Sequence, residues 1–175
     1  METSFVEKNT NLIPSVAQEK LIRDLLSPKF RLFTATKVPL GFIAGMKITH
    51  LSLEKCQTTI PFKFLNINPF KSIYFAAQSM AAELSTASLA MLAMEGIKPS
   101  FAFIIVSMEA TFTKKATDKV TFTCEDGKIV QDAIRECIET GKPITARLKT
   151  VGKMPDGTEV STFYFTWSFK QRTKN

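Results

Sequence analysis

One acidic residue stands inside a long apolar segment and is the first candidate for chemistry. Glu83 lies within residues 73–94, which contain no Gly and no Pro and are rich in Ala, Leu and Met. This composition predicts an α-helix. A carboxylate is costly to bury unless it is paired or used. Glu83 is therefore either a general base or nucleophile, or a structural acid with a partner in the core.

The residues that surround Glu83 on the expected helix are mostly small. Those within two turns of it are Ala76, Ser79, Met80, Thr86, Ala87 and Ala90. Another backbone or a ligand can approach a surface of this kind closely, since positions three and four apart share a face. The larger apolar residues point in all directions around the helix, and this pattern predicts burial on all sides.

The same segment is long enough to cross a bilayer. Gln78 and Glu83 lie near its middle, however, and the acid alone costs about 2.5–3.5 kcal/mol on insertion scales. Lys71 and Lys98 flank the two ends, so no orientation signal exists. We expect a buried helix of a globular domain and no membrane span.

Composition fits one domain over residues 1–175, with an N-terminal helix and cover segment at 1–40 and the core at 41–170. Residues 1–11 are polar and lack the apolar stretch of a secretory signal. Cys56, Cys124 and Cys137 are odd in number and widely spaced, which suits a reducing cytoplasm. The single histidine, His50, excludes a zinc site of ordinary type, and no metal is expected.

The net charge of +7 is compatible with nucleic acid, anionic lipid or a phosphate-bearing cofactor as a partner. The basic residues are scattered along the chain, which is more typical of a solvated surface. Nucleic-acid binding would rest on charge alone and is not expected.

Patterning before the central helix predicts one helix and two strands. Residues 15–26 read as an amphipathic helix, residues 30–40 as an irregular cover, and residues 42–51 and 55–62 as strands joined by a turn at 52–54. The apolar side of the first helix consists of Val16, Leu21, Ile22 and Leu25. His50 is in phase with Met46 and Ile48, which predicts a partly buried structural histidine.

After the central helix, the pattern predicts four strands and one short helix. The strands are expected at 101–112, 119–124, 144–151 and 158–170, with a turn at 155–157. A helix at 128–140 would pack through Ile129, Ala133, Ile134 and either Cys137 or Ile138. The fold class is therefore α+β, with an antiparallel six-stranded sheet in meander-like order wrapped around one long central helix.

This order resembles the hotdog fold, and residues 68–83 resemble the start of the helix in PaaI-like acyl-CoA thioesterases, most closely their DUF4442 branch. Those proteins commonly read Asn, then His-Gly-Gly, then an acid nine positions after the His. Asn68 and Glu83 match the Asn and the acid, and Ala76 matches the second Gly. Tyr74 and Phe75 stand where the His and the first Gly usually are.

The resemblance implies a thioesterase that acts on acyl-CoA or acyl-carrier-protein thioesters. Glu83 would be the general base or nucleophile, and Asn68 would position water or the carbonyl. Backbone N–H groups of the first helical turn would polarise that carbonyl. The substrate-binding residues would be Tyr74, Phe75, Ala76, Ser79 and Lys71, with Lys114 and Arg147 as further candidates for the phosphates of coenzyme A. Coenzyme A would enter only as part of the substrate.

The changed His-Gly-Gly turn motivates an alternative, a non-catalytic hotdog protein that binds acyl thioesters or lipid. A hotdog dehydratase or hydratase would use a catalytic histidine, and His50 lies before the helix, in the wrong place for that role. The resemblance also implies a homodimer, or a dimer of dimers, formed through the strand after the helix, with the sites between subunits. Residues 101–106 are apolar on both faces, which agrees with a covered edge strand.

Overall fold

The computed structural model describes residues 13–172, and the polar segment 1–11 lies outside them. In chain order the elements are α1 (Val16–Leu26), α2 (Lys29–Lys37), α3 (Pro39–Ala44), β1 (Lys47–Leu51), β2 (Cys56–Ile60), the 3₁₀ turn η1 (Phe64–Asn66), α4 (Phe75–Met94), β3 (Phe101–Phe112), β4 (Val120–Cys124), α5 (Gly127–Thr140), β5 (Ile144–Lys153) and β6 (Glu159–Gln171).

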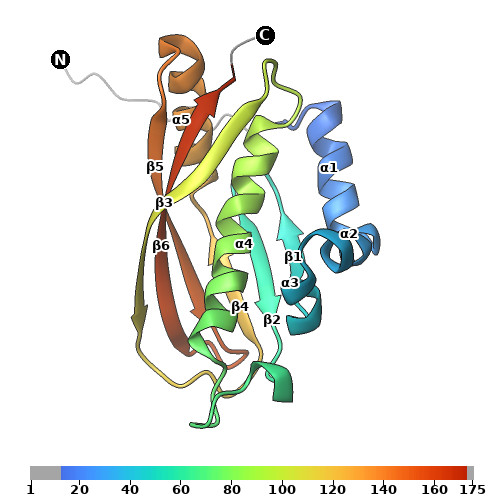
Figure 1. Cartoon of the computed structure of the whole chain (residues 1–175), viewed down its shortest axis with the longest axis vertical. Helices are drawn as coiled ribbons and strands as arrows, with labels where there is room; N and C mark the ends of the chain where they lie inside the picture. Colours follow the sequence, from blue (N-terminus) through green and yellow to red (C-terminus); the bar gives the residue numbers. More distant parts are fainter. Residues whose placement is uncertain (1–12, 173–175) are drawn as a thin grey trace, which may run out of the picture.

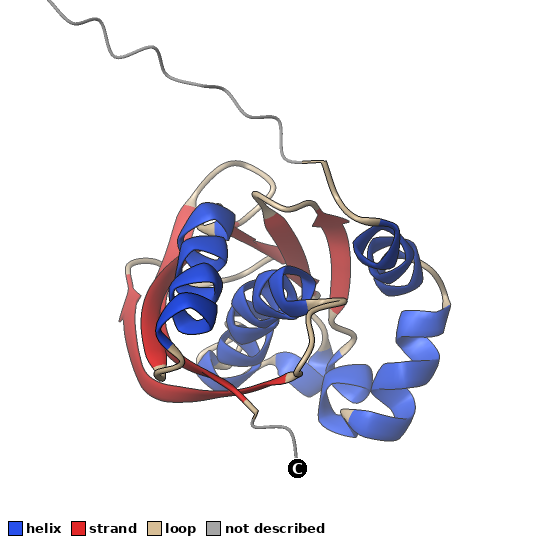
Figure 2. Cartoon of the chain, turned by 90° about the horizontal axis from the view of Figure 1, so that it is seen from above, coloured by secondary structure: helices blue, strands red, loops and turns tan. Residues whose placement is uncertain are grey.

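The strands form one antiparallel sheet in the order β1-β2-β4-β5-β6-β3. The sheet curves around α4, as Figures 1 and 2 show from two sides. This is the hotdog fold that the resemblance implies. The expected meander is interrupted, because β3 pairs with β6 and not with β4, the next strand in the chain. β3 therefore lies at one edge of the sheet.

The inner face of the sheet supplies most of the core. Phe163, Phe165, Trp167 and Phe169 alternate inward along β6, as the sequence predicts. They pack with Phe122 of β4, whose ring lies 5.7 Å from that of Phe163. Burying such rings stabilises the fold by roughly 1.5–3 kcal/mol each.

Helix α4 has one buried side and one open side, so the prediction that it is buried on all sides is wrong. Small residues such as Ala77, Ala81 and Ala82 face the sheet and let the helix approach it closely. The residues left partly exposed fall in groups three to four positions apart: Ala76, Ser79, Met80, Glu83, Leu84, Ala87, Met91, Ala93 and Met94. An apolar helix with an open side indicates a surface that something else covers.

Polar side chains on the buried side of α4 are matched by partners on the sheet. The hydroxyl of Ser161 donates to Gln78 Oε1 at 2.9 Å, and Trp167 Nε1 donates to Thr86 Oγ1 at 3.0 Å. Thr58 Oγ1 donates to the carbonyl of Ala81 at 2.6 Å. Buried polar groups must be paired in this way, and the pairs fix which side of α4 faces outward.

The region before β1 differs from the sequence-based expectation. Residues 30–40 are not irregular but form α2 and the start of α3, and the strand expected from residue 42 begins only at Lys47. Helix α2 buries only Phe30 and Thr34, and α3 buries only Gly41 and Ala44. Neither helix therefore has a stripe of large apolar residues that the sequence pattern would show. In α1, Val16 is exposed, and the helix packs through Leu21, Ile22 and Leu25.

Two further side chains are oriented differently from the prediction. His50 is exposed, because a register shift between Ile48 and His50 interrupts the alternation and turns Leu51 inward instead. In α5, Ala133, Ile134 and Cys137 are buried as predicted, together with Val130, whereas Ile129 and Ile138 are about half exposed. No helix among residues 13–172 is long and apolar enough to cross a membrane.

Candidate functional site

The start of α4 presents backbone donors without partners. Gln78 N is the first amide to bond within the helix, donating to the carbonyl of Tyr74 at 3.1 Å. The amides of Phe75, Ala76 and Ala77 precede it, and none of them donates to another described residue. Tyr74 occupies the N-cap position without a capping side chain. The first turn can therefore donate to an oxygen that develops negative charge.

A cleft of about 630 Å³ lies beside this helix start. Its walls are the loop before α4, the first turn of α4 and the end of β3 with the segment that follows. The residues that line it are Asn68, Pro69, Phe70, Ser72, Ile73, Tyr74, Phe75, Gln78, Phe112, Thr113, Lys114, Lys115 and Ala116. The lining is mainly apolar and aromatic with a few polar groups, as is typical of ligand sites.

The loop between Asn68 and Ser72 is closed by Asn68 itself. The side-chain oxygen of Asn68 accepts from Phe70 N at 3.0 Å, from Ser72 N at 3.3 Å and from Ser72 Oγ at 3.2 Å. Because two of these donors are backbone amides, the oxygen is identified and is fully used. The Nδ2 group has no acceptor among the described residues. Asn68 can thus donate to a ligand carbonyl but is poorly suited to accept from a water.

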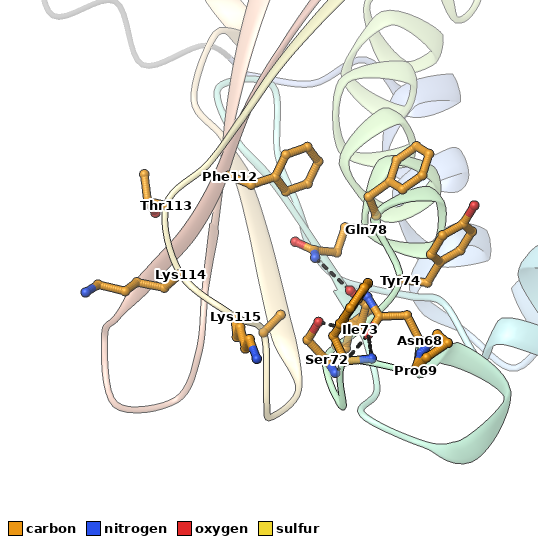
Figure 3. A pocket seen from close by; sticks show the side chains of 13 residues that line it. Asn68, Pro69, Ser72, Ile73, Tyr74, Gln78, Phe112, Thr113, Lys114 and Lys115 are labelled. Carbon is orange, nitrogen blue, oxygen red and sulfur yellow. Dashed lines mark hydrogen bonds between the residues drawn. The ribbon is translucent and has the colours of Figure 1, made fainter.

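Three aromatic side chains surround the free amides. The rings of Tyr74 and Phe75 lie 4.7 Å apart, edge to face, and that of Phe112 lies 6.4 Å from Phe75. Figure 3 shows Phe112 pointing from β3 toward α4. Tyr74 and Phe75 are about half exposed. They form an apolar rim where the resemblance places a histidine and a glycine.

Glu83 lies further along the helix and is not part of the wall of this cleft. It lies eight positions after Phe75, which corresponds to about 12 Å along the helix axis. It is on the open side of α4 and is half-buried. Among residues 13–172 its carboxylate has neither a hydrogen bond nor an ion pair, and burial raises its pKa above the usual range of a carboxyl.

The structure brings some of the predicted site residues together and separates others. Asn68, Tyr74 and Phe75 share the cleft. Ala76 and Ser79 lie between the cleft and Glu83 on the open side of the helix, and the Ser79 hydroxyl donates to the carbonyl of Phe75 at 2.9 Å. Within one chain, Asn68 makes no hydrogen bond to Glu83.

The predicted cationic residues are spread over three places. Lys71 lies in the 68–72 loop with a positive φ of 57° and is exposed outside the cleft wall. Lys114 borders the cleft, although its side chain extends away from it in Figure 3. Arg147 lies on the outer face of the sheet, where it bonds Glu109 at 3.0 Å and stacks on Tyr164. Arg147 is therefore already engaged.

Gln78 and Phe112 are cleft residues to which sequence reasoning gave no role. Gln78 Nε2 donates to the carbonyl of Ile73 at 3.0 Å, which ties the first turn of α4 to the segment before it. An amide in the first turn of an otherwise apolar helix is a signal that could have identified it. No pattern in the sequence indicates that Phe112 lies at the site, because its position beside α4 depends on the pairing of β3 with β6.

No group of three or more His, Cys, Asp or Glu side chains in the described part of the chain could hold a metal ion. The groups that could take part in chemistry at this site are the carboxylate of Glu83, the amide of Asn68 and the backbone donors of α4.

Comparison with protein families gives one match, which spans most of the chain. The family model described as a domain of unknown function, DUF4442, matches residues 28–168. No protein with a curated description matches the sequence.

Solved structures with the same fold include several described as thioesterases. A probable thioesterase from Pseudomonas aeruginosa superposes with a TM-score of 0.71 at 18% identity, covering 86% of this chain and 100% of that one. A putative thioesterase from Shewanella oneidensis gives a TM-score of 0.68 at 10% identity, covering 87% and 99%. A thioesterase from Haemophilus influenzae gives 0.60 at 10% identity, covering 83% and 91%. At these identities the likeness establishes the fold.

Proposed function

The chain belongs to the DUF4442 family of hotdog proteins, and on this premise we propose that it is a thioesterase that hydrolyses an acyl thioester carried by coenzyme A or an acyl carrier protein. The observation that carries the proposal is the unpaired, half-buried carboxylate of Glu83 on the same helix as three free amides. Thioesterase-type neighbours share the fold and support the reaction class.

The chemistry assigns different roles to the two parts of α4. The free amides at its start, with Asn68 Nδ2, donate to the thioester oxygen as it gains charge, and one such donor contributes about 2.7–4 kcal/mol to transition-state stabilisation. Glu83 activates a water as general base, or attacks the carbonyl itself. Its raised pKa brings a carboxylate closer to the strength that a base needs near neutral pH.

The spacing between Asn68 and Glu83 in the sequence has a parallel in one structural neighbour. Two variants of a Staphylococcus aureus protein, described in one case as a thioesterase enzyme, replace a glutamate and a glutamine fifteen positions before it. Glu83 and Asn68 are also fifteen positions apart. An amide side chain and an acid thus occur at equal spacing in the two sequences, which supports assigning functional roles to both Asn68 and Glu83.

A second copy of the chain would complete the site. Glu83 and the cleft of one chain do not meet, whereas no residue between 13 and 172 covers the open side of α4 or the free edge of β3. Two copies related by a two-fold axis would pair their β3 edges and bring the open sides of their α4 helices together. In such a dimer, Glu83 of each chain faces residues of the other. Dimers of this kind can pair again to form tetramers.

One observation favours a second function, binding of an acyl thioester or lipid without hydrolysis. The rings of Tyr74 and Phe75 stand beside the free amides, where the thioester carbonyl must reach. An apolar rim at this place can hold an acyl chain while keeping the carbonyl from the amides. Under this alternative Glu83 would have no role in turnover.

The deciding experiment is a thiol-release assay over a panel of acyl-CoA thioesters of different chain lengths, with acyl carrier protein thioesters in parallel. Glu83→Gln tests the base, and Glu136→Gln, an exposed acid on α5, is the matched control. Hydrolysis by the unchanged protein and by Glu136→Gln, but not by Glu83→Gln, supports the thioesterase. Binding of acyl-CoA without thiol release supports the second function.

We also propose a cytoplasmic location, which the state of the cysteines supports. Cys56, Cys124 and Cys137 are buried and unpaired as free thiols, as expected in a reducing compartment.

A further inference from the structure

Helix α3 has an inverted distribution of side chains. It buries its two smallest residues, Gly41 and Ala44, and exposes the large ones. Leu40 is 69% exposed and Ile43 is 52% exposed. A helix that packs only against its own domain places its large apolar residues inward. The outward side of α3 therefore has the large apolar side chains that are typical of a contact surface.

The 3₁₀ turn η1 repeats this inversion beside α3. It buries the polar Asn66, whose Nδ2 donates to the carbonyls of Ala44 at 2.9 Å and Pro61 at 2.8 Å. The apolar residues Phe64 and Leu65 are 89% and 66% exposed. Two neighbouring elements thus present bare apolar side chains at one end of the molecule, where Figure 1 shows η1 below α3.

These exposed residues form one patch, because the two elements are joined directly. Lys63 Nζ donates to the carbonyl of Ile43 at 2.6 Å, and the bonds of Asn66 tie η1 to the end of α3. We call this surface the α3–η1 patch. It consists of Leu40, Ile43, Phe64 and Leu65.

The chain segments that form the α3–η1 patch and its flanks contain basic residues and no acidic ones. Residues 29–47 and 61–74, which form α2, α3, η1 and the loop after it, contain no acidic residue, whereas the neighbouring segment before β4 carries Asp118, two positions before the Val120 that pairs with Ile60. Their cationic residues are Lys29, Arg31, Lys37, Lys47, Lys63 and Lys71. Lys29 is paired with Asp24 of α1, and the other five form no ion pair with any residue between 13 and 172. Their charge is therefore available to an anionic partner.

We propose that the α3–η1 patch docks on the surface of an anionic phospholipid bilayer. Bare apolar side chains that insert between headgroups, flanked by cations that meet lipid phosphates, are the combination that holds proteins at a membrane interface. A second copy of the chain is a poor occupant, because two such patches would bring ten unpaired cations together. The docking surface is separate from Glu83 and from the proposed reaction.

The test is flotation of the full chain with vesicles of phosphatidylcholine that contain about one third phosphatidylserine, a composition that gives a negative surface. The protein is expected to float with these vesicles, to remain behind with pure phosphatidylcholine, and to be released by high salt. Phe64→Ser with Leu65→Ser is expected to weaken binding about tenfold or more. Lys37→Glu with Lys47→Glu is expected to do the same.

Matched controls lie at the other end of the molecule. Ile129→Ser with Ile138→Ser removes two exposed apolar side chains from α5, and Lys142→Glu with Lys170→Glu reverses two exposed charges. Both should float like the unchanged protein. Failure to bind anionic vesicles, or equal binding by all variants, would overturn the proposal. A smaller particle mass for Phe64→Ser with Leu65→Ser in light scattering would also overturn it, since the patch would then be a subunit interface.

Discussion

Trp167 Nε1 donates a hydrogen bond of 3.0 Å to Thr86 Oγ1, and this bond joins the last strand of the sheet to the central helix. Both side chains are buried. Thr86 also bonds the carbonyl of Glu83, the candidate catalytic residue, at 2.9 Å. The rotation of α4 that leaves Glu83 on the open side is therefore fixed in part by a tryptophan more than eighty positions away in the sequence.

Thr86→Val is expected to lower the free energy of unfolding by about 1–3 kcal/mol, because it leaves the indole N–H buried without a partner. Urea unfolding followed by fluorescence measures this. Thr145→Val, on the exposed face of β5, is the matched control and should change stability by no more than about 0.5 kcal/mol. Equal stability of the two variants would contradict the assigned role of the bond.

Glu83→Gln is expected to lower turnover at least about a hundredfold, the low end of what a general base contributes. The substitution keeps the size and hydrogen-bonding capacity of the side chain and removes only the base. Thiol release under single-turnover conditions measures the chemical step. Near-normal turnover by this variant would move the catalytic role to another residue.

The pH dependence should follow the raised pKa of Glu83. A general base works in its ionised form, so activity should rise with pH through the raised value and then level off. The midpoint should lie above about 4.3, the ordinary value for glutamate. A midpoint at or below that value would show that another group controls the rate.

The same pKa shift affects stability with a defined sign. Burial favours the protonated form of Glu83 in the folded protein. The contribution of this side chain to the free energy of unfolding is therefore fully present below the ordinary pKa of glutamate in the unfolded chain. It is lost as the pH rises through the raised value. The free energy of unfolding of Glu83→Gln, compared with that of the unchanged protein, should therefore be higher at neutral pH than at acidic pH. Unfolding in urea at several pH values tests this, and a constant difference would contradict it.

Asn68→Asp should reduce turnover while leaving the fold intact. The aspartate retains an oxygen that accepts from Phe70 N and Ser72 N, but it lacks the Nδ2 donor proposed to bind the carbonyl. Thermal stability should stay close to that of the unchanged protein, whereas Asn68→Ala should lose both turnover and stability. Full activity of Asn68→Asp would remove Asn68 from the site.

Light scattering should report a mass near twice that of the 19.6 kDa chain, or four times if dimers pair. Leu84→Glu places a second acid beside Glu83 on the open side of α4 and should give a single chain, because like charges would face each other across the two-fold axis. Ile129→Glu on α5 is the control and should leave the mass unchanged. A stable and active single chain would refute both the interface and the shared site.

Local patterning was sufficient for the elements with strong, uninterrupted signals. The absence of Gly and Pro predicts α4, and the strict alternation of Phe163, Phe165, Trp167 and Phe169 predicts β6. β3 has the predicted bounds Phe101–Phe112. The acid inside an apolar helix identified Glu83 as a candidate because burial of a lone carboxylate is costly wherever the helix packs.

Other features depend on contacts between segments far apart in the chain, which no local pattern encodes. The pairing of β3 with β6 brings Phe112 beside Phe75 and builds the cleft. A register shift against β2 turns His50 outward although its spacing predicts burial.

The open side of α4 also depends on contacts between segments that lie far apart in the chain. A helix apolar in all directions has no sequence signal that distinguishes the side facing the sheet from the side left free. The choice is made by pairs such as Trp167 with Thr86 and Ser161 with Gln78, which exist only after the sheet has closed around the helix. The sequence by itself determined that Glu83 would lie on this helix, and the tertiary structure decided that it faces outward, because buried polar groups on the opposite side must find their partners.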